Sequence, residues 1–450
     1  MSLINILPSI VNESKESAHV IKSGNYIAAE QIGLGQNILV QGDNLPFMQF
    51  LLEQKNLQGK INLIYIDPPF FSKANYGSEI KLYSEKIKSI PVIKQKAYHD
   101  IWNNGMEEYL RMLYTRFLLI KELLTEDGCL WVHLDWHSVH YVKVLLDDIF
   151  GEKNFINEII WNYKSGGVSK RRFARKHDTL LFYAKSSKYY FKAQKEISYN
   201  RDYKPYRFKG VAEYKDELGW YTMVNMKDVW QINMVGRTSA ERTGYATQKP
   251  EKLIERILES CTREGDLCAD FFGGAGTLAA TADRMGRRWI SCDIGELASI
   301  NTHKRLVSET KNGYIYYVDS EHSENKGNLS IEVDLEQLPI SDKYKLTLTI
   351  KEYMLDLFDS IPVEEKHLPI IKKIMKENSL QLVNYWSVDF DYDDKLFKPK
   401  IFFCKGNDGI TQSCEWLAQK FEKIGIRCID IFGNSTFHVI DLRREREDEA

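Results

Sequence analysis

Asn62-Leu63-Ile64-Tyr65-Ile66-Asp67-Pro68-Pro69-Phe70 joins an apolar run to an acid, two prolines and an aromatic ring. The run over residues 61–66 predicts a fully buried strand. Pro68 and Pro69 have no backbone N–H, hold φ near about −65° and bias Asp67 toward an extended conformation. We therefore expect the carboxylate, the prolyl carbonyls and the ring to point outward from the carboxyl end of the strand, where ligands bind in open parallel sheets.

This tip suits the methylation of an amino group. The exocyclic amine of a nucleobase is a poor nucleophile, because its lone pair is delocalised into the ring. The Asp67 carboxylate and the Pro68 carbonyl could accept both N–H bonds and direct the lone pair at an incoming methyl group. Phe70 would stack on a base flipped out of its helix. Taken alone, the tetrapeptide fits a simple strand-to-loop turn equally well.

Three motifs in combination resemble those of DNA amino-methyltransferases. Asp67-Pro68-Pro69-Phe70 is similar to their catalytic tetrapeptide, and Asp270-Phe271-Phe272-Gly273-Gly274-Ala275-Gly276-Thr277 is similar to their glycine motif for S-adenosyl-L-methionine (AdoMet). Thr247-Gln248-Lys249-Pro250 is similar to the segment that precedes that motif. The catalytic motif comes first, which is the order of the beta class. That class includes the modification (Mod) subunits of type III restriction-modification systems, and the resemblance covers residues 37–306.

The resemblance implies an α/β fold with a doubly wound, Rossmann-like sheet in permuted motif order. It implies methyl transfer from AdoMet to the N6 amine of a flipped-out adenine in double-stranded DNA, with Asp67, Pro68, Pro69 and Phe70 as catalytic residues. Cytosine N4 is the alternative acceptor. In the family, Asp at the first position of the tetrapeptide accompanies adenine more often, whereas Ser accompanies cytosine N4. The resemblance places the following residues at the cofactor: Asp43, Thr247, Lys249, Asp270, Phe272, Gly274, Gly276, Thr277 and Asp293.

Some of these assignments have competing explanations. Asp43 follows a predicted strand and would serve equally well as a helix cap. Asp293 ends a strand, where it would accept hydrogen bonds from the ribose hydroxyls. Ala275 and Leu278 stand where the family usually has Ser and Thr, which leaves Thr277 and the Thr247/Lys249 pair as candidates for the methionine carboxylate.

Two functions of other classes also fit parts of the sequence. Residues 274–279 satisfy the G-x-G-x-x-A dinucleotide pattern with Asp293 near the required spacing, so an NAD-dependent oxidoreductase is one alternative. A non-catalytic DNA-binding protein is the other. The glycine loop lacks Gly-Lys-Ser/Thr, which excludes a P-loop nucleotide hydrolase. The chain has no Pro-Cys pair, which argues against a cytosine-C5 methylase.

Composition indicates a globular protein. The chain has 450 residues, 43% hydrophobic and 28% charged, without a membrane-spanning run or a signal sequence, and we expect it in the cytoplasm. Seven cysteines without Cys-x-x-Cys predict buried, reduced thiols. Net charge is −2, with about −6 on residues 331–450 and about +4 on the remainder, which places DNA contacts in the first three quarters.

Two further clusters bear on function. His133, Asp135 and His137 lie close together, but we expect no metal site, because amine methylation needs none. Residues 164–177 are basic without an acid and contain the flexible pair Gly166-Gly167. This density suits contacts to DNA phosphates, with a solvated surface loop as the alternative. The predicted DNA-binding residues are Lys170, Arg171, Arg172, Arg175 and Lys176.

The predicted organisation has six parts. Residues 1–36 form an N-terminal extension, and residues 37–189 and 244–306 form the catalytic and AdoMet-binding halves of one domain. Residues 190–243 form an irregular insert that interleaves aromatic and basic residues, at the family's target-recognition position. Residues 307–330 form a linker, and residues 331–450 a small α+β accessory domain. The resemblance allows for a partner restriction subunit and for a homodimer.

Overall fold

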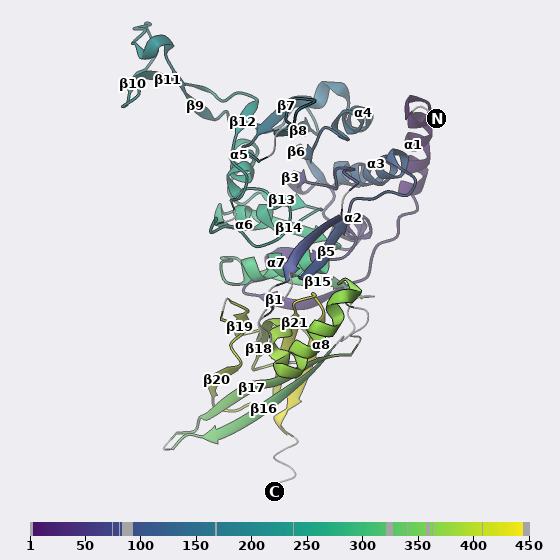
Figure 1. Cartoon of the computed structure of the whole chain (residues 1–450), viewed down its shortest axis with the longest axis vertical. Coiled ribbons are helices and arrows are strands. Elements are labelled where there is room, and N and C mark those ends of the chain that lie inside the picture. The colour runs from purple at the N-terminus through teal and green to yellow at the C-terminus, as the bar shows by residue number, and fades with distance from the viewer. Residues whose placement is uncertain are drawn as a thin grey trace.

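The computed structural model describes residues 3–73, 75–80, 82, 93–166, 169–236, 238–320, 327–339, 341–356, 361, 363–406 and 408–443. The protein has an α/β part, which contains both ends of the predicted methyltransferase region (residues 37–306). A mainly β part lies below it (Figure 1). Helices cover both faces of the sheet in the α/β part. Three predicted features lie partly outside the described residues: the polar segment after Phe70, Gly167 of the basic loop, and residues 321–326 of the linker.

The α/β part is built on one mixed sheet of order β1-β15-β2-β14-β13-β3-β6-β8-β7-β12. The strands from β15 to β6 run parallel, whereas β1 and β8 are antiparallel to their neighbours. The bounds in sheet order are β1 Tyr26–Ile32, β15 Tyr314–Asp319, β2 Asn37–Gln41, β14 Arg288–Asp293, β13 Leu267–Asp270, β3 Ile61–Ile66, β6 Leu124–Leu134, β8 His177–Ala184, β7 Phe155–Asn162 and β12 Val229–Gln231.

Alternation along the buried strands divides the core between the two faces of the sheet. In β3, Ile64 and Ile66 pack on one face, while Leu63 and Tyr65 pack on the other. The first face is covered by α1 Leu3–Ala18, α2 Asn44–Glu53, α3 Met106–Leu123 and α4 Val139–Phe150. The second is covered by α5 Glu251–Cys261, α6 Thr277–Arg284 and α7 Glu296–Val307.

The sheet winds in two directions from the neighbouring strands β3 and β13. From β13 the chain passes through α6 to β14 on one side, and from β3 it passes through α3 to β6 on the other. β13 and β3 pair in parallel, with Cys268 opposite Leu63 and Ala269 opposite Ile64. Their carboxyl ends therefore meet where the strand order reverses, which is where open α/β sheets bind ligands. This topology confirms the predicted doubly wound class.

The two predicted boundary segments are integrated into this sheet. The N-terminal extension supplies α1, which packs on α3, and β1, which pairs with β15. β15 itself lies inside residues 307–330 and inserts between β1 and β2. The prediction of a linker there is therefore wrong for residues 314–319. The polar residues from Asp319 onward obscured the short run Tyr314-Ile315-Tyr316-Tyr317-Val318 that forms the strand.

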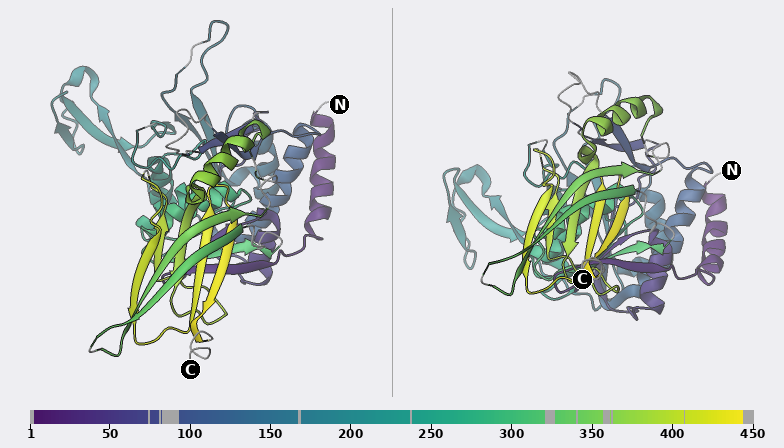
Figure 2. Two further views of the ribbon diagram at one scale, coloured as in Figure 1. Left: turned by 60° about the horizontal axis from the view of Figure 1, so that its bottom comes forward. Right: turned by 90° about the horizontal axis from the view of Figure 1, so that it is seen from below.

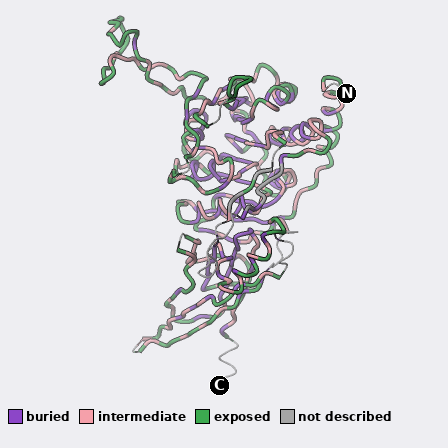
Figure 3. Tube along the Cα trace, viewed as in Figure 1, coloured by how far each residue is buried: buried purple, intermediate pink, exposed green. Residues whose placement is uncertain are grey.

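The insert is more ordered than predicted. β9 Lys195–Tyr199, β10 Glu213–Lys215 and β11 Trp220–Asn225 form an antiparallel sheet of order β10-β11-β9, and β12 joins β7 in the main sheet. The small sheet extends from the body as an arm (Figure 2), and most of its surface is exposed (Figure 3). No residue of its three short strands is buried, so they lack the hydrophobic alternation that identifies a half-buried strand.

The C-terminal part has its own hydrophobic core. Two antiparallel sheets of order β16-β17-β20 and β19-β18-β21-β22 pack with one helix. The elements are β16 Gly327–Gln337, β17 Tyr344–Leu355, α8 Leu368–Glu377, β18 Val383–Asp389, β19 Ile401–Cys404, β20 Ser413–Ala418, β21 Lys423–Asp430 and β22 Ser435–Asp441. The α+β character predicted for this region is therefore present, and within the described residues no helix is both long and apolar enough to cross a bilayer.

Candidate active site

A cavity of about 480 Å³ opens where the carboxyl ends of β3 and β13 meet. The β3 tip supplies one wall and the glycine loop after β13 supplies the opposite one, while the 245–249 segment and α3 close the sides. The predicted residues on its lining are Asp43, Asp67, Pro68, Pro69, Phe70, Thr247, Lys249, Asp270, Phe272, Gly274, Thr277 and Asp293. Gly276 lies behind the lining. The structure thus brings the predicted catalytic tetrapeptide and all the predicted cofactor residues except Gly276 to the lining of one cavity.

Asp67 is held by one charged partner and keeps one free acceptor. Its Oδ2 pairs with the Lys249 ammonium group, and both side chains are mostly buried. Its Oδ1 is buried and has no hydrogen-bond partner among the described residues. A buried carboxylate oxygen without a partner is costly in a folded protein. Asp67 can therefore accept a hydrogen bond from a polar hydrogen that enters the cavity.

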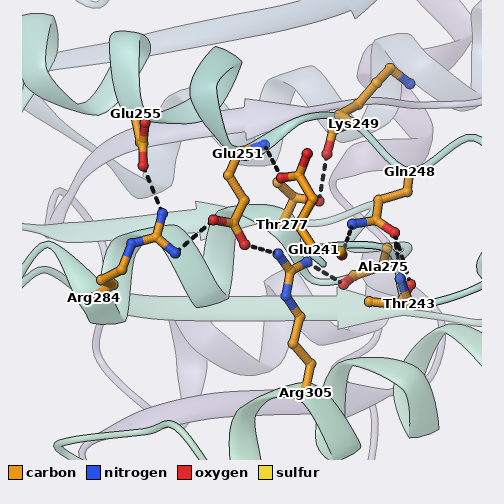
Figure 4. A network of polar contacts seen from close by, with 10 residues as sticks. All are labelled: Glu241, Thr243, Gln248, Lys249, Glu251, Glu255, Ala275, Thr277, Arg284 and Arg305. Carbon is orange, nitrogen blue, oxygen red and sulfur yellow. Dashed lines mark hydrogen bonds and ion pairs between the residues drawn. The ribbon is translucent and has the colours of Figure 1, made fainter. Parts of the chain in front are cut away.

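Lys249 is positioned by its backbone and by its neighbours in the segment 241–251. The Thr277 hydroxyl donates to the Lys249 carbonyl oxygen at 3.1 Å. The Gln248 carboxamide donates to the Glu241 carbonyl at 2.6 Å and accepts from the Thr243 N–H at 2.9 Å. Figure 4 shows these bonds folding the segment on itself, with the Lys249 side chain directed away from them. This arrangement fixes where the Lys249 ammonium group can reach.

A second set of bonds joins α5, at the end of this segment, to the glycine loop. Glu251 pairs with Arg305 and with Arg284, the latter at 2.6 Å, and Arg305 donates to the Ala275 carbonyl at 3.0 Å (Figure 4). Arg284 also contacts Glu255 at 2.7 Å. The network ties the segment that carries Lys249 to the loop that faces it across the cavity.

The glycine loop is shaped by close backbone contacts. Asp293 accepts hydrogen bonds from the Gly274 N–H at 2.8 Å and the Gly295 N–H at 2.7 Å. A Cβ on Gly273 would lie 2.4 Å from the Ser291 hydroxyl, and one on Gly276, where φ is +68°, would lie 2.5 Å from Thr302. Side chains at these two positions would collide with their neighbours, so the loop requires glycine there.

Carboxylates dominate the cofactor side of the cavity. Burial raises the pKa of Asp270 well above its usual value, although the Phe272 N–H opposes this shift. Burial also raises the pKa of Asp293, against its two bonds from Gly295 and Gly274. Both acids gain from a cationic ligand, which would offset the cost of holding their charges in a buried site. The donor set thus fits a cationic cofactor such as a sulfonium.

Asp43 is the predicted helix cap, and its predicted place at the cofactor stays a prediction. Its carboxylate caps α2 by accepting from the Leu45 N–H at 2.9 Å, and it also lines the cavity. Arg116 of α3 donates to Asp43 at 2.9 Å and to the Asn44 side chain at 2.5 Å. Burial lowers the pKa of Arg116, against the attraction of Asp43. The sequence contains a signal for Arg116, because it interrupts the apolar face of its helix.

A hydrogen-bonded chain supports the tip of β3 from behind. The Tyr65 hydroxyl contacts His133 Nδ1 at 2.9 Å, and His133 Nε2 contacts Asp178 at 3.2 Å. The Phe70 ring stacks on the His133 ring at a centroid distance of 5.7 Å. His137 instead binds Asp135, and the described residues contain no cluster of three potential metal ligands. His133 therefore supports the Phe70 ring.

Asp100 holds the backbone that follows Phe70. Phe71 (φ +64°) and Lys73 (φ +59°) adopt left-handed conformations that are unfavourable for residues other than glycine. The Asp100 carboxylate accepts from the Phe71 N–H at 3.0 Å and from the Ser72 N–H at 2.6 Å. It also accepts from the Trp102 indole N–H at 3.1 Å. Asp100 and Trp102 line the cavity, but sequence reasoning did not identify them.

The basic loop joins β7 to β8. β7 runs parallel to β6, so this loop leaves the same edge of the sheet as the β3 tip. It extends away from the body (Figure 2). Its predicted DNA-binding residues are exposed, apart from the half-buried Lys176, and the Arg175 guanidinium lies 3.4 Å from the centroid of the Trp136 ring. The loop also presents Phe173 at 98% exposure, an aromatic residue that sequence reasoning passed over.

The fold and this cavity together define an AdoMet-dependent amino-methyltransferase. The chain belongs to the DNA methylase family, whose N6/N4 pattern it matches over residues 61–300. This match confirms the predicted family and cofactor. It also assigns the glycine loop to a methylase rather than to an NAD-dependent oxidoreductase.

Similar proteins come from restriction-modification systems. The type II methyltransferase M2.DpnII of Streptococcus pneumoniae is 27% identical over 286 residues, which cover 61% of this chain and 91% of the relative. The probable type III HindVI Mod subunit of Haemophilus influenzae is 34% identical over 134 residues, 30% of this chain and 15% of the relative. Among solved structures, the cytosine-N4-specific PvuII DNA methyltransferase aligns with a TM-score of 0.41 and 16% identity, over 62% of this chain and 90% of that one.

Proposed function

We propose that this protein methylates the N6 amine of adenine in double-stranded DNA at a specific site. The observation that carries the proposal is the buried, unpartnered Oδ1 of Asp67 on a cavity that also contains the glycine loop. An unpartnered acceptor on a residue of the cavity lining is what an amine nucleophile requires. The Pro68 carbonyl is the second acceptor, because Pro68 and Pro69 hold the backbone of the tip outward.

The chain would accelerate transfer by positioning. Asp67 Oδ1 and the Pro68 carbonyl each accept one N–H of the amine, which leaves its lone pair free to attack. Phe70, supported by the His133 ring, stacks on the flipped base and fixes its plane. As positive charge develops on the amine nitrogen, the Asp67 carboxylate stabilises it within a partly buried site. No covalent intermediate with the protein is needed.

The opposite side of the cavity would hold AdoMet. AdoMet supplies a methyl group on a cationic sulfur. Asp270, Asp293 and Asp43 provide negative charge on the lining, and the glycine loop allows the backbone to come close to the ligand. Each Asp293 oxygen that binds a loop N–H retains a lone pair for a ribose hydroxyl. Thr247, Lys249 and Thr277 form the polar wall near the tip, where the methionine carboxylate would lie.

DNA would approach from the sheet edge that carries the cavity. The basic loop leaves this edge, and its lysines and arginines suit phosphate contacts. The arm formed by β9–β11 exposes aromatic side chains, among them Tyr203, Tyr206, Phe208 and Tyr214. We assign it to target recognition, with contacts to base edges in a groove. Relatives named as Mod subunits of type III enzymes suggest a restriction subunit as a partner.

Adenine is the proposed acceptor because the tip begins with Asp. An ionised carboxylate is a stronger acceptor than the Ser hydroxyl associated with cytosine N4. Both amines donate two hydrogen bonds, so the remaining residues of the tip suit either base. The test is mass spectrometry of nucleosides from DNA methylated by the purified protein. N6-methyladenine is the expected product. N4-methylcytosine without N6-methyladenine would show that the acceptor is cytosine, and the proposed amino-methyltransferase mechanism would be retained.

A further inference from the structure

The segment 71–102 connects the cavity to the C-terminal part of the protein. It leaves the cavity directly after Phe70, contains the hairpin β4 Asn75–Ile80 and β5 Ile93–His99, and returns with Asp100 and Trp102 on the cavity lining. The start and the end of the segment are joined at the cavity by the bonds from Asp100 to Phe71 and Ser72. A displacement of the hairpin would therefore be transmitted to residues of the cavity wall.

The far end of this segment is buried in the C-terminal core. Ile93 is completely buried, and Leu82 nearly so, in the same hydrophobic cluster as Phe432 and Ile361. The Gln95 carboxamide is 1% exposed and donates to the Phe432 carbonyl at 2.9 Å. The Gln95 backbone also forms an isolated bridge with Val363. Figure 1 shows β5 lying between the α/β part and α8.

The C-terminal part is itself fixed to the main sheet. Glu30 of β1 is completely buried and accepts from the Tyr385 hydroxyl at 2.6 Å and the Ser387 hydroxyl at 3.2 Å, both on β18. Arg427 of β21 pairs with Glu30 at 3.3 Å. Breaking a buried ion pair of this kind leaves an uncompensated charge, so the two parts resist relative movement. The hairpin is consequently held against a part of the protein that is itself anchored to β1 of the main sheet.

We infer that the C-terminal domain is a positioning device, which holds the segment 71–102 so that Asp100 and Trp102 form the target-base side of the cavity. This inference rests on the proposed function. Phe71 and Lys73 keep unfavourable left-handed conformations only because their surroundings impose them. Release of the hairpin would let this backbone relax and would displace Phe70, which is adjacent to Phe71. The cofactor side, built on β13 and β14, would stay intact.

The inference is tested with Ile93→Ala in the full chain. Ile93 anchors the hairpin but does not line the cavity, so its truncation should loosen the segment without altering a cavity residue. Leu346→Ala is the matched control, because Leu346 is equally buried in the same cluster but lies on β17, opposite Leu335 and Trp416. Gln95→Leu is the second hairpin variant. It retains the side-chain volume, so it can be used if Ile93→Ala fails to fold. Each protein is assayed for AdoMet affinity, single-turnover methylation of DNA and hydrogen exchange in residues 71–80.

Both hairpin variants should exchange faster in residues 71–80 and lose about tenfold or more in the methylation rate, because small displacements of reacting groups are costly. Their AdoMet dissociation constants should remain within about twofold of wild type, and Leu346→Ala should keep the wild-type rate. Wild-type rates in variants whose hairpin exchanges faster would overturn the inference. An equal loss of rate in Leu346→Ala would also overturn it. A wild-type protein that binds AdoMet but methylates no DNA would contradict the proposed function instead, since the exchange data would still report on the hairpin.

Discussion

The Lys249 ammonium group pairs with the Asp67 carboxylate, although 182 positions separate the two residues in the sequence. Lys249 Nζ also lies 5.1 Å from the centroid of the Phe70 ring. It therefore occupies the region between the acceptor and the ring, where the proposed amine and its base must enter. The pair orients the Asp67 carboxylate through Oδ2, while Oδ1 has no partner among the described residues and is the acceptor proposed for the amine.

Asp67→Ala should abolish methyl transfer while AdoMet binding survives. The reason is that Asp67 is proposed to contact the amine, whereas the acids proposed to face AdoMet are Asp43, Asp270 and Asp293. Single-turnover methylation and calorimetric titration of AdoMet measure the two effects. Asp67→Asn is the isosteric control and should retain only a small part of the rate. Wild-type turnover in Asp67→Ala would remove this residue from the mechanism.

Lys249→Met should reduce the transfer rate by up to about 100-fold, because Asp67 loses the partner that orients it and small misplacements in an active site are costly. Lys249→Arg keeps the charge and should recover part of the rate. Arg256→Met is a suitable control for the loss of a partly buried cation, since Arg256 packs on Trp230 outside the cavity. A rate for Lys249→Met equal to wild type would show that the ion pair is dispensable.

Asp293→Ala should weaken AdoMet binding by about 1–3 kcal/mol. The change removes a proposed acceptor for the ribose and also releases the Gly274 and Gly295 N–H groups that Asp293 binds. Equilibrium dialysis with labelled AdoMet measures the loss. Asp266→Ala, at the opposite end of β13, is the control for a lost acid near the same strand. An unchanged dissociation constant would make Asp293 a purely structural residue.

Replacing Lys170, Arg171, Arg172, Arg175 and Lys176 by Ala should flatten the salt dependence of DNA affinity. Each lost phosphate contact should reduce the slope of log K against log salt by roughly 0.9, because fewer counterions are released. Fluorescence anisotropy across a salt series measures this slope. The control is the double change Lys372→Ala and Lys373→Ala, which removes two exposed positive charges from α8. A slope equal to wild type would assign the basic loop to a solvated surface.

Asp430 should make stability depend on pH. Burial raises the pKa of Asp430 to about 6, against hydrogen bonds that include those from Asn434 and Phe432. The unfolded chain releases this proton near pH 3.9, so the contribution of Asp430 is present below about pH 4 and is lost as pH rises through about 6. The loss amounts to about 3 kcal/mol in the free energy of unfolding. Denaturant unfolding of wild type and Asp430→Asn at pH 4 to 7 measures this loss. The same dependence of the free energy of unfolding on pH in both proteins would refute the prediction.

Local sequence determined the sheet and the two walls of the cavity. Strands β2, β3, β13 and β14 were predictable because buried parallel strands are short apolar runs that end in turns. The tip Asp67–Phe70 and the glycine loop are each encoded in a few adjacent residues, and their chemistry follows from those residues. Parallel strand order then requires both to lie at one edge of the sheet, so the meeting of the two motifs could be anticipated.

Only the tertiary structure decided which distant residues complete the site. The Lys249–Asp67 pair, the Asp43–Arg116 contact and the Asp100 clamp join side chains whose separation in sequence carries no local signal. β1 joins the sheet through β15, and β15 lies between β1 and β2, so the place of each strand depends on segments far away in the sequence. Neither strand of the hairpin, Asn75–Ile80 or Ile93–His99, contains a run of apolar residues in the sequence, so the hairpin was not predicted. It becomes part of the fold because the C-terminal core buries Ile93 and Leu82, which is a property of packing between distant segments and cannot be derived from local propensity.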